Sequence, residues 1–148
     1  MKVSVGDAAP DFRLLSNAGR EVSLSEFRDK KNVVLYFYPK DETQGCTKEA
    51  CAFRDAYGRF KDSGTEVLGV SSDTVESHKA FAGHHNLEFP LLSDPDGKLR
   101  KAYGVPSTLG FLPGRVTYVI DKQGTVRFVF NSQVHPERHI TEALKALQ

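Results

Sequence analysis

The sequence has few cysteines, no long apolar run and no excess of one charge. Only two cysteines occur in 148 residues, which argues against a small domain held together by disulfides. No stretch approaches the roughly 20 apolar residues of a membrane span. The 20 basic and 19 acidic residues nearly cancel, and no basic run carries interleaved aromatic residues. Nucleic acid and membrane are therefore not expected partners.

The chain also lacks the motifs of several other classes. Its five histidines show no metal-site spacing with the cysteines, so we expect surface histidines, no metal and no cofactor. The glycine-containing segment 104–110 lacks the lysine-serine ending of a phosphate loop. No linker, internal repeat or low-complexity segment interrupts the chain, so we expect one domain over residues 1–148.

Both cysteines lie around the start of one predicted helix. Val33–Tyr38 is a β-branched and aromatic run typical of a buried strand, and Pro39 ends it. Apolar residues then recur at helical spacing from about Thr43 to Lys61, with Thr43 as a plausible N-cap. Cys46 therefore falls in the first turn, where free N–H groups and the helix dipole stabilise an anion. This position predicts a depressed thiol pKa and thiol redox chemistry.

Cys51 follows Cys46 by five residues, a separation that an intact helix does not allow a disulfide to bridge. The two Cα atoms of such a pair lie roughly 8 to 9 Å apart, whereas a disulfide needs less than about 7 Å. Joining them requires the first turns to unwind, which favours a catalytic pair over a structural crosslink. The alternative is that both are small buried apolar residues; it is competitive for Cys51 and weaker for Cys46.

Strands and helices alternate along the chain, which predicts an α/β sheet packed by helices. The expected strands cover 33–38, 66–71, 89–92, 116–120 and 125–130. The expected helices cover 43–61, 75–85 and 97–103, and a last one starts at 135–137. Lys122–Gly124 reads as the hairpin turn between the last two strands.

The segment around Cys46 resembles the active site of the peroxiredoxins. Their signature Pro-x-x-x-Thr-x-x-Cys is met by Pro39, Thr43 and Cys46. The cysteine spacing resembles the subgroup of peroxiredoxin Q and bacterioferritin comigratory protein, as do segments 6–12, 51–55, 91–94, 112–115 and 117–121. One difference is Gln44, where the subgroup usually has proline. Gln44 restores an N–H and loosens the helix entrance.

The resemblance implies a thioredoxin-like fold with a central mixed sheet flanked by helices and an N-terminal extension. It also implies a thiol peroxidase acting on hydrogen peroxide and alkyl hydroperoxides. Cys46 would become a sulfenic acid, and Cys51 would resolve it as an intramolecular disulfide. Thr43 would orient the thiolate and the peroxide, and Arg115 would supply a fixed positive charge. Backbone N–H groups near Gly45 would polarise the oxygen under attack.

Three supporting residues and an apolar rim complete the expected site. Pro39 and Gly45 belong to the active-site loop, and Glu49 either hydrogen-bonds to Arg115 or the loop, or lies on a solvated helix face. Phe111 and Leu112 form either an apolar rim for alkyl hydroperoxides or part of the core.

The resemblance also implies partners and compartment: thioredoxin as reductant and a monomeric protein. No signal-peptide hydrophobic region appears in residues 1–7, so we expect the cytoplasm; the alternative is the chloroplast, if a transit peptide has been removed. Two other functions remain open. One is a thioredoxin-like disulfide oxidoreductase, whose usual Cys-x-x-Cys spacing is absent; the other is a binding module that holds a metal through its thiols.

Overall fold

The computed structural model describes all residues except 1, 109–111, 133–134 and 148. Five strands form its central sheet in the order β5-β4-β3-β8-β9. They are β3 (Asn32–Phe37), β4 (Thr65–Ser71), β5 (Leu91–Ser93), β8 (Val116–Ile120) and β9 (Val126–Asn131). Strands β3, β4 and β5 run parallel, whereas β8 pairs antiparallel with both β3 and β9. The expected mixed sheet is confirmed.

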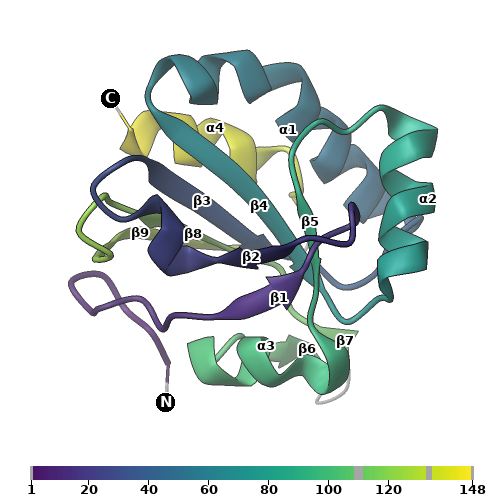
Figure 1. Ribbon diagram of the computed structural model, residues 1–148, viewed down its shortest axis with the longest axis horizontal. Helices are drawn as coiled ribbons and strands as arrows, with labels where there is room; N and C mark the ends of the chain where they lie inside the picture. The colour runs from purple at the N-terminus through teal and green to yellow at the C-terminus, as the bar shows by residue number, and fades with distance from the viewer. Residues whose placement is uncertain (1, 109–111, 133–134, 148) are drawn as a thin grey trace.

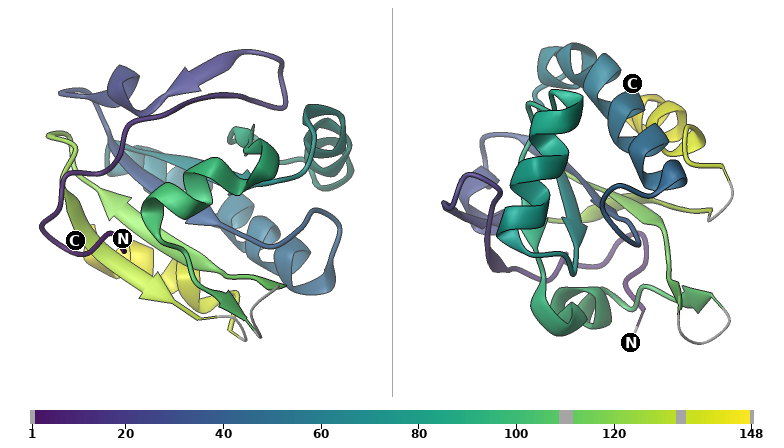
Figure 2. Two further views of the ribbon diagram at one scale, coloured as in Figure 1. Left: turned by 90° about the horizontal axis from the view of Figure 1, so that it is seen from below. Right: turned by 90° about the vertical axis from the view of Figure 1, so that its right-hand side faces the viewer.

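Within the described residues, four helices and two small sheets surround this central sheet (Figures 1 and 2). The helices are α1 (Gln44–Asp62), α2 (Val75–His85), α3 (Lys98–Tyr103) and α4 (Arg138–Ala146), with short 3-10 helices at Leu24–Phe27 and Pro95–Gly97. The two small sheets pair β1 (Arg13–Leu15) with β2 (Glu21–Ser23), and β6 (Ser107–Thr108) with β7 (Leu112–Pro113). Helices α1 and α4 lie side by side on one face, and the β1–β2 hairpin and α3 lie on the other.

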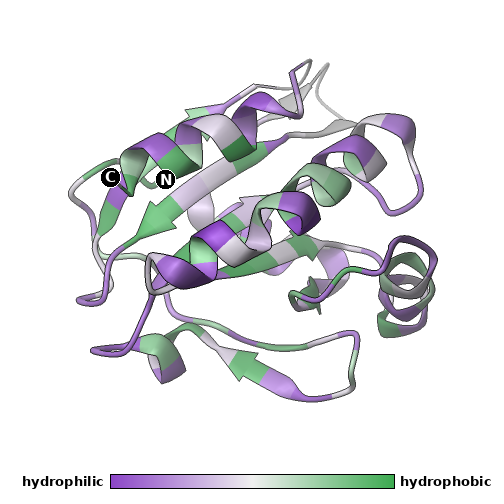
Figure 3. Ribbon diagram, turned by 90° about the horizontal axis from the view of Figure 1, so that it is seen from above, coloured by the Kyte–Doolittle hydropathy of each residue, from purple (hydrophilic) through white to green (hydrophobic). Residues whose placement is uncertain are grey.

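Strand β3 contributes side chains to both hydrophobic cores because they alternate between the two faces of the sheet. Val34 and Tyr36 pack with Phe53 of α1 on one face, whereas Leu35 and Phe37 pack on the other. Every residue of β3 after Asn32 is buried. Figure 3 shows the corresponding hydrophobic strands, with polar and apolar residues alternating along α1. Burial on both faces fixes β3, and with it the loop that leads to Cys46.

The predicted strands and helices are present, with their ends shifted by one or two residues in most cases. The last helix begins at Arg138, not at 135–137, because Glu137 occupies its N-cap position. The turn at Lys122–Gly124 is confirmed, and Gly124 adopts the positive φ of 81° that glycine tolerates. The sequence patterns do not predict the two short strand pairs β1–β2 and β6–β7. None of the helices in the described part of the chain is long and apolar enough to cross a membrane.

Candidate active site

Cys46 lies in the first turn of α1, where the sequence places it. Strand β3 ends at Phe37, a loop follows, and α1 begins at Gln44. The first turn closes when the Thr47 N–H donates to the Thr43 carbonyl at 2.8 Å. The side chain of Cys46 faces inward and is only 1% exposed. The N–H groups that precede Thr47 have no partner within the helix, so they are available to an anion at this turn.

Arg115 and Glu49 meet Cys46 in a buried cluster. The Nη2 atom of Arg115 donates to the Cys46 Sγ at 3.4 Å, and Nη1 donates to the Glu49 Oε1 at 2.5 Å. Glu49 follows Cys46 on α1, while Arg115 directly precedes β8. The antiparallel pairing of β8 with β3 sets Val116 opposite Phe37, which brings Arg115 to the start of α1. Both charged side chains are buried, so Glu49 does not lie on a solvated helix face.

Burial and charge act in opposite directions on this ion pair. Burial raises the pKa of Glu49 to about 8, although the neighbouring Arg115 opposes the shift. Burial lowers the pKa of Arg115, but the negative charges of Glu49 and Cys46 outweigh this effect and raise it. Arg115 is therefore cationic throughout the physiological range, whereas burial favours the protonated form of Glu49.

Thr43 and Gly45 prepare the start of α1 in different ways. Thr43 occupies the N-cap with an extended backbone, but its hydroxyl donates to the Lys40 carbonyl at 2.9 Å and caps no helical N–H. Gly45 lies directly beneath the guanidinium, since an added Cβ would sit 3.1 Å from the Arg115 Nη2. A glycine at this position allows Arg115 to approach Cys46 closely.

Cys51 is a free, partly exposed thiol further along α1, and Cys46 is free as well. The helix is continuous from Gln44 to Asp62, so residues 46 and 51 keep the helical separation of roughly 8 to 9 Å. In this conformation the two cysteines are therefore too far apart to form a disulfide.

Arg100 is a buried residue of the site that the sequence did not indicate. Its Nη2 donates to the Tyr38 carbonyl at 3.0 Å and its Nη1 to the Gly114 carbonyl at 3.1 Å. It therefore ties the segment after β3 to the residue before Arg115. Burial lowers the pKa of Arg100. A single arginine on a short helix has no sequence signal that separates it from a solvated one.

Asp41 and His78 form a second buried network that anchors the active-site loop. The Asp41 Oδ2 lies 2.7 Å from the His78 Nδ1, and the Tyr38 hydroxyl donates to Oδ1 at 2.6 Å. The backbone N–H of Asp41 donates to Asp73 at 2.8 Å. Asp41, Asp73 and His78 are ligand types close enough to share a metal ion, but these hydrogen bonds already engage them.

The expectation of surface histidines is wrong for two of the five. His78 and His139 are 0% exposed, whereas His84 and His135 are exposed and His85 is half-buried. The buried pair bond to backbone carbonyls and polar side chains of distant elements. Such partners come together only in the fold, so spacing along the chain does not reveal them.

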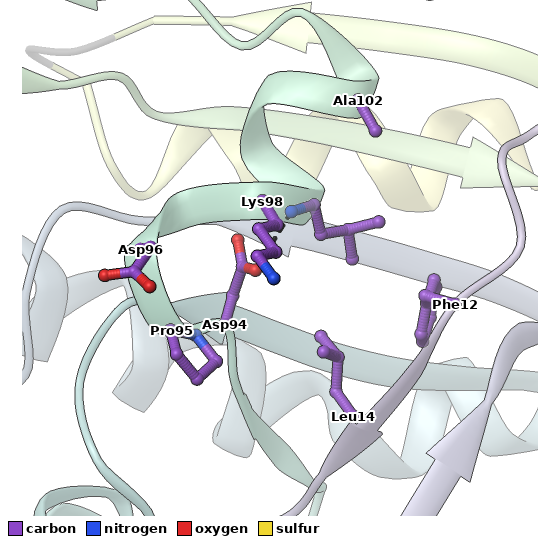
Figure 4. Close-up of a pocket in the computed structure, with 8 residues that line it drawn as sticks. Phe12, Leu14, Asp94, Pro95, Asp96, Lys98 and Ala102 are labelled. Carbon is purple, nitrogen blue, oxygen red and sulfur yellow. Dashed lines mark hydrogen bonds between the residues drawn. The ribbon is translucent and has the colours of Figure 1, made fainter.

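A hollow of about 310 Å³ lies away from Cys46, between the β1 segment and α3 (Figure 4). Phe12 and Leu14 line one side and Lys98 lines the other. Neither Cys46 nor Arg115 contributes to it. The predicted apolar rim at Phe111 lies outside the described residues, and the side chain of Leu112 is likewise not described.

Comparisons with known proteins agree with this geometry. Residues 5–129 match the AhpC/TSA family. Peroxiredoxin Q, chloroplastic, from Sedum lineare is 59% identical over 148 residues, covering 99% of this chain and 79% of that protein. The crystal structure of peroxidoxin BcpB from Mycobacterium tuberculosis has a TM-score of 0.90 at 37% identity, over 98% of this chain and 96% of the other.

A third comparison concerns a structure described in terms of alkyl peroxide reduction. This bacterioferritin comigratory protein from Xanthomonas campestris has a TM-score of 0.87 at 31% identity, over 98% of this chain and 95% of the other. The shared fold is thioredoxin-like. The chain therefore belongs to the AhpC/TSA family and is, within it, a peroxiredoxin of the peroxiredoxin Q subgroup, a thiol-dependent peroxidase.

Proposed function

We propose that Cys46 is the peroxidatic cysteine. Its thiolate attacks the terminal oxygen of a hydroperoxide, so that an S–O bond forms as the O–O bond breaks. The leaving oxygen takes a proton and departs as water or alcohol, and Cys46 becomes a sulfenic acid. The observation that carries this assignment is the 3.4 Å contact from the Arg115 Nη2 to the Cys46 Sγ. A fixed cation at that distance stabilises both the thiolate and the charge on the leaving oxygen.

The other predicted residues have supporting roles in this proposal. Pro39 ends the strand segment that precedes the loop, and Gly45 leaves room for the guanidinium. Glu49 holds Arg115 in place through Nη1. Thr43 orients the thiolate and the peroxide; this role requires its hydroxyl to leave the Lys40 carbonyl, which it contacts at 2.9 Å.

Cys51 is proposed as the resolving cysteine. Its thiolate attacks the Cys46 sulfenic sulfur, a disulfide forms and water leaves. Because α1 holds the two residues too far apart, its first turns must unwind before this step. A dithiol protein of the thioredoxin type then reduces the disulfide and restores both thiols.

Substrate, assembly and compartment follow from the same proposal. We expect hydrogen peroxide and alkyl hydroperoxides as substrates, in agreement with the description of the Xanthomonas relative. An intramolecular disulfide permits a monomer, and a single domain over residues 1–148 is consistent with one central sheet. The sequence predicted the cytoplasm, whereas the name of the Sedum relative supports the chloroplast alternative.

The test is peroxide consumption with thioredoxin, thioredoxin reductase and NADPH. Wild-type protein should turn over, Cys46→Ser should not, and Cys51→Ser should consume about one equivalent per thiol before it stops. Turnover by Cys46→Ser would contradict the assignment. Insulin reduction without peroxide turnover would support the thioredoxin-like oxidoreductase instead. Near-stoichiometric zinc bound through the thiols would support the metal-binding module.

A further inference from the structure

Helix α2 contacts the chain on both sides of the two cysteines. Before the first cysteine, the carboxylate of Asp41 bonds to side chains in the first turn of α2. After the second cysteine, the Nη1 atom of Arg54 donates to the carbonyl of His85, the last residue of α2, at 2.8 Å. The residues that can rearrange to join the cysteines, within 42–53, are therefore bordered by two points held on the same helix.

The contact before the cysteines is a buried network. The Oδ2 atom of Asp41 accepts from the Ser77 hydroxyl at 2.9 Å and lies 2.7 Å from the His78 Nδ1. The Nε2 atom of His78 lies 2.9 Å from the Leu92 carbonyl in β5. Asp41 and His78 are both buried, so pulling Asp41 away would leave buried polar groups without partners. Asp41 is thus fixed to α2 and, through His78, to the sheet.

The contact after the cysteines combines Arg54 with its neighbour in the core. Phe53 is buried and stacks on Tyr36 of β3, with 4.4 Å between the ring centroids. Arg54 then crosses to the end of α2. The remainder of α1 buries one face against the same core. From Phe53 onwards α1 is therefore held by the sheet and by α2 together.

The first residues between these two contacts are held less firmly. Residues 42–44 are exposed, and Glu42 has a positive φ of 65°, which is unfavourable for a residue other than glycine. The Glu42 carboxylate lies 2.5 Å from the exposed His84 and 3.4 Å from the half-buried His85. Exposed pairs of this kind add little stability. Unwinding of α1 should therefore begin just after Asp41.

We propose that Asp41 and Arg54 are positioning residues, which α2 holds in place in both the thiol and the disulfide form, so that α1 unwinds only between them. This inference rests on the proposed role of Cys51 as the resolving cysteine. It keeps β3 and the second half of α1 intact in the disulfide form. Fewer residues then have to be ordered again when the disulfide is reduced.

The first test places the same substitution inside and outside the proposed limits. Ala50 and Ala56 are both buried residues of α1, and glycine destabilises a helix relative to alanine. Each variant is equilibrated with mixtures of reduced and oxidised dithiothreitol, and the Cys46–Cys51 disulfide is quantified by alkylation. Ala50→Gly should favour the disulfide about fivefold, because only the thiol form keeps residue 50 helical. Ala56→Gly should change the equilibrium by less than about twofold.

The second test follows the end of the unwound segment at Asp41, by hydrogen–deuterium exchange of the disulfide form. The Asp41 N–H donates to Asp73 at 2.8 Å, and it should stay protected in wild type. His78→Leu removes the imidazole that faces Asp41, so this protection should be lost. His78→Asn keeps a donor on that side and should restore it. Ser77→Ala removes one hydroxyl donor and should lower the protection even if His78→Leu does not fold.

The same measurement follows the other end of the segment. Residues 58–62 should stay protected in the disulfide form of wild type. Arg54→Met should lower their protection, because the bond to the His85 carbonyl is lost. Arg59→Met changes an exposed arginine of the same helix and should leave the protection unchanged. Equal protection in Arg54→Met and Arg59→Met would overturn the role of Arg54.

The outcomes also distinguish this inference from the proposed function. If the disulfide forms but Ala56→Gly shifts its equilibrium as much as Ala50→Gly, or Asp41 loses protection in wild type, the anchors fail and the resolving role of Cys51 stands. If wild type forms no Cys46–Cys51 disulfide with dithiothreitol or with peroxide, the proposed function fails, and this inference fails with it.

Discussion

Replacing Arg115 by methionine should slow the reaction of Cys46 with peroxide far more than it disturbs the fold. The guanidinium lies 3.4 Å from the sulfur, and two unit charges at that distance interact by about 5 kcal/mol at an effective dielectric constant of about 20. If about half of this interaction acts in the transition state, the loss is roughly 100-fold in the second-order rate constant. Methionine fills a similar volume but carries no charge.

The same substitution removes the partner of a buried carboxylate. Glu49 loses the cation that opposes its raised pKa, so its carboxyl should stay protonated to higher pH than in wild type. This protonation limits the loss of stability near neutral pH. As pH rises above about 4.5, the ordinary pKa of the carboxyl, the variant should become progressively less stable, because the unfolded chain ionises Glu49 whereas the folded protein must keep it protonated. Arg115→Met with Glu49→Gln should recover that stability but not the rate.

The assay is stopped-flow reaction of the pre-reduced protein with hydrogen peroxide, alongside urea unfolding at pH 6 and pH 9. The double variant is the matched control, because it separates loss of catalysis from loss of stability. A rate for Arg115→Met within about threefold of wild type would refute the electrostatic reasoning.

Three further changes should give measurable results. Gln44→Pro places proline at the first helical position, and the extended backbone of Thr43 tolerates it. This change should stabilise the helix start by about 0.4–1 kcal/mol and slow disulfide formation about two- to fivefold, as measured by rapid quench. An unchanged rate would argue against unwinding as the slow step. Gly45→Ala puts a Cβ 3.1 Å from the Arg115 Nη2 and should displace the guanidinium. The rate of the reaction with peroxide should fall about three- to tenfold with little loss of stability. A normal rate would show that Arg115 can shift without consequence. The pKa of His139 falls from 6.5 to about 4 on folding, so the free energy of unfolding should drop by up to about 3 kcal/mol as pH decreases from 6.5 to 4. Urea unfolding midpoints should show this loss in wild type and not in His139→Gln. The same dependence of the midpoint on pH in both proteins would contradict this prediction.

The features that the sequence predicts well are local ones. The apolar run of β3 and the helical spacing after it place Cys46 in the first turn of α1, as found. These patterns depend on the spacing of apolar residues along the chain and on the proline that ends the strand segment. The mixed sheet and Arg115 came from the resemblance to peroxiredoxins, since no local pattern at Arg115 marks it as more than a strand-end residue.

The parts of the site that the sequence does not reveal are non-local. Arg100, His78 and His139 are single polar residues whose burial depends on partners brought together by the sheet. Their hydrogen bonds join residues far apart in the chain, such as His78 with Asp41. Spacing arguments therefore place the two histidines at the surface, where lone polar residues usually lie, and give no indication of Arg100.

The central claim is that Cys46 takes the peroxide oxygen and Cys51 then closes a disulfide with it. The most direct test is peptide mass spectrometry after one equivalent of hydrogen peroxide is added to the reduced protein. Wild type should yield a linked Cys46–Cys51 peptide that has lost two hydrogen atoms, and Cys51→Ser should gain one oxygen atom on Cys46, trapped as the sulfenic acid. Oxidation found first at Cys51, or a Cys46 thiol left intact in both proteins, would contradict the account.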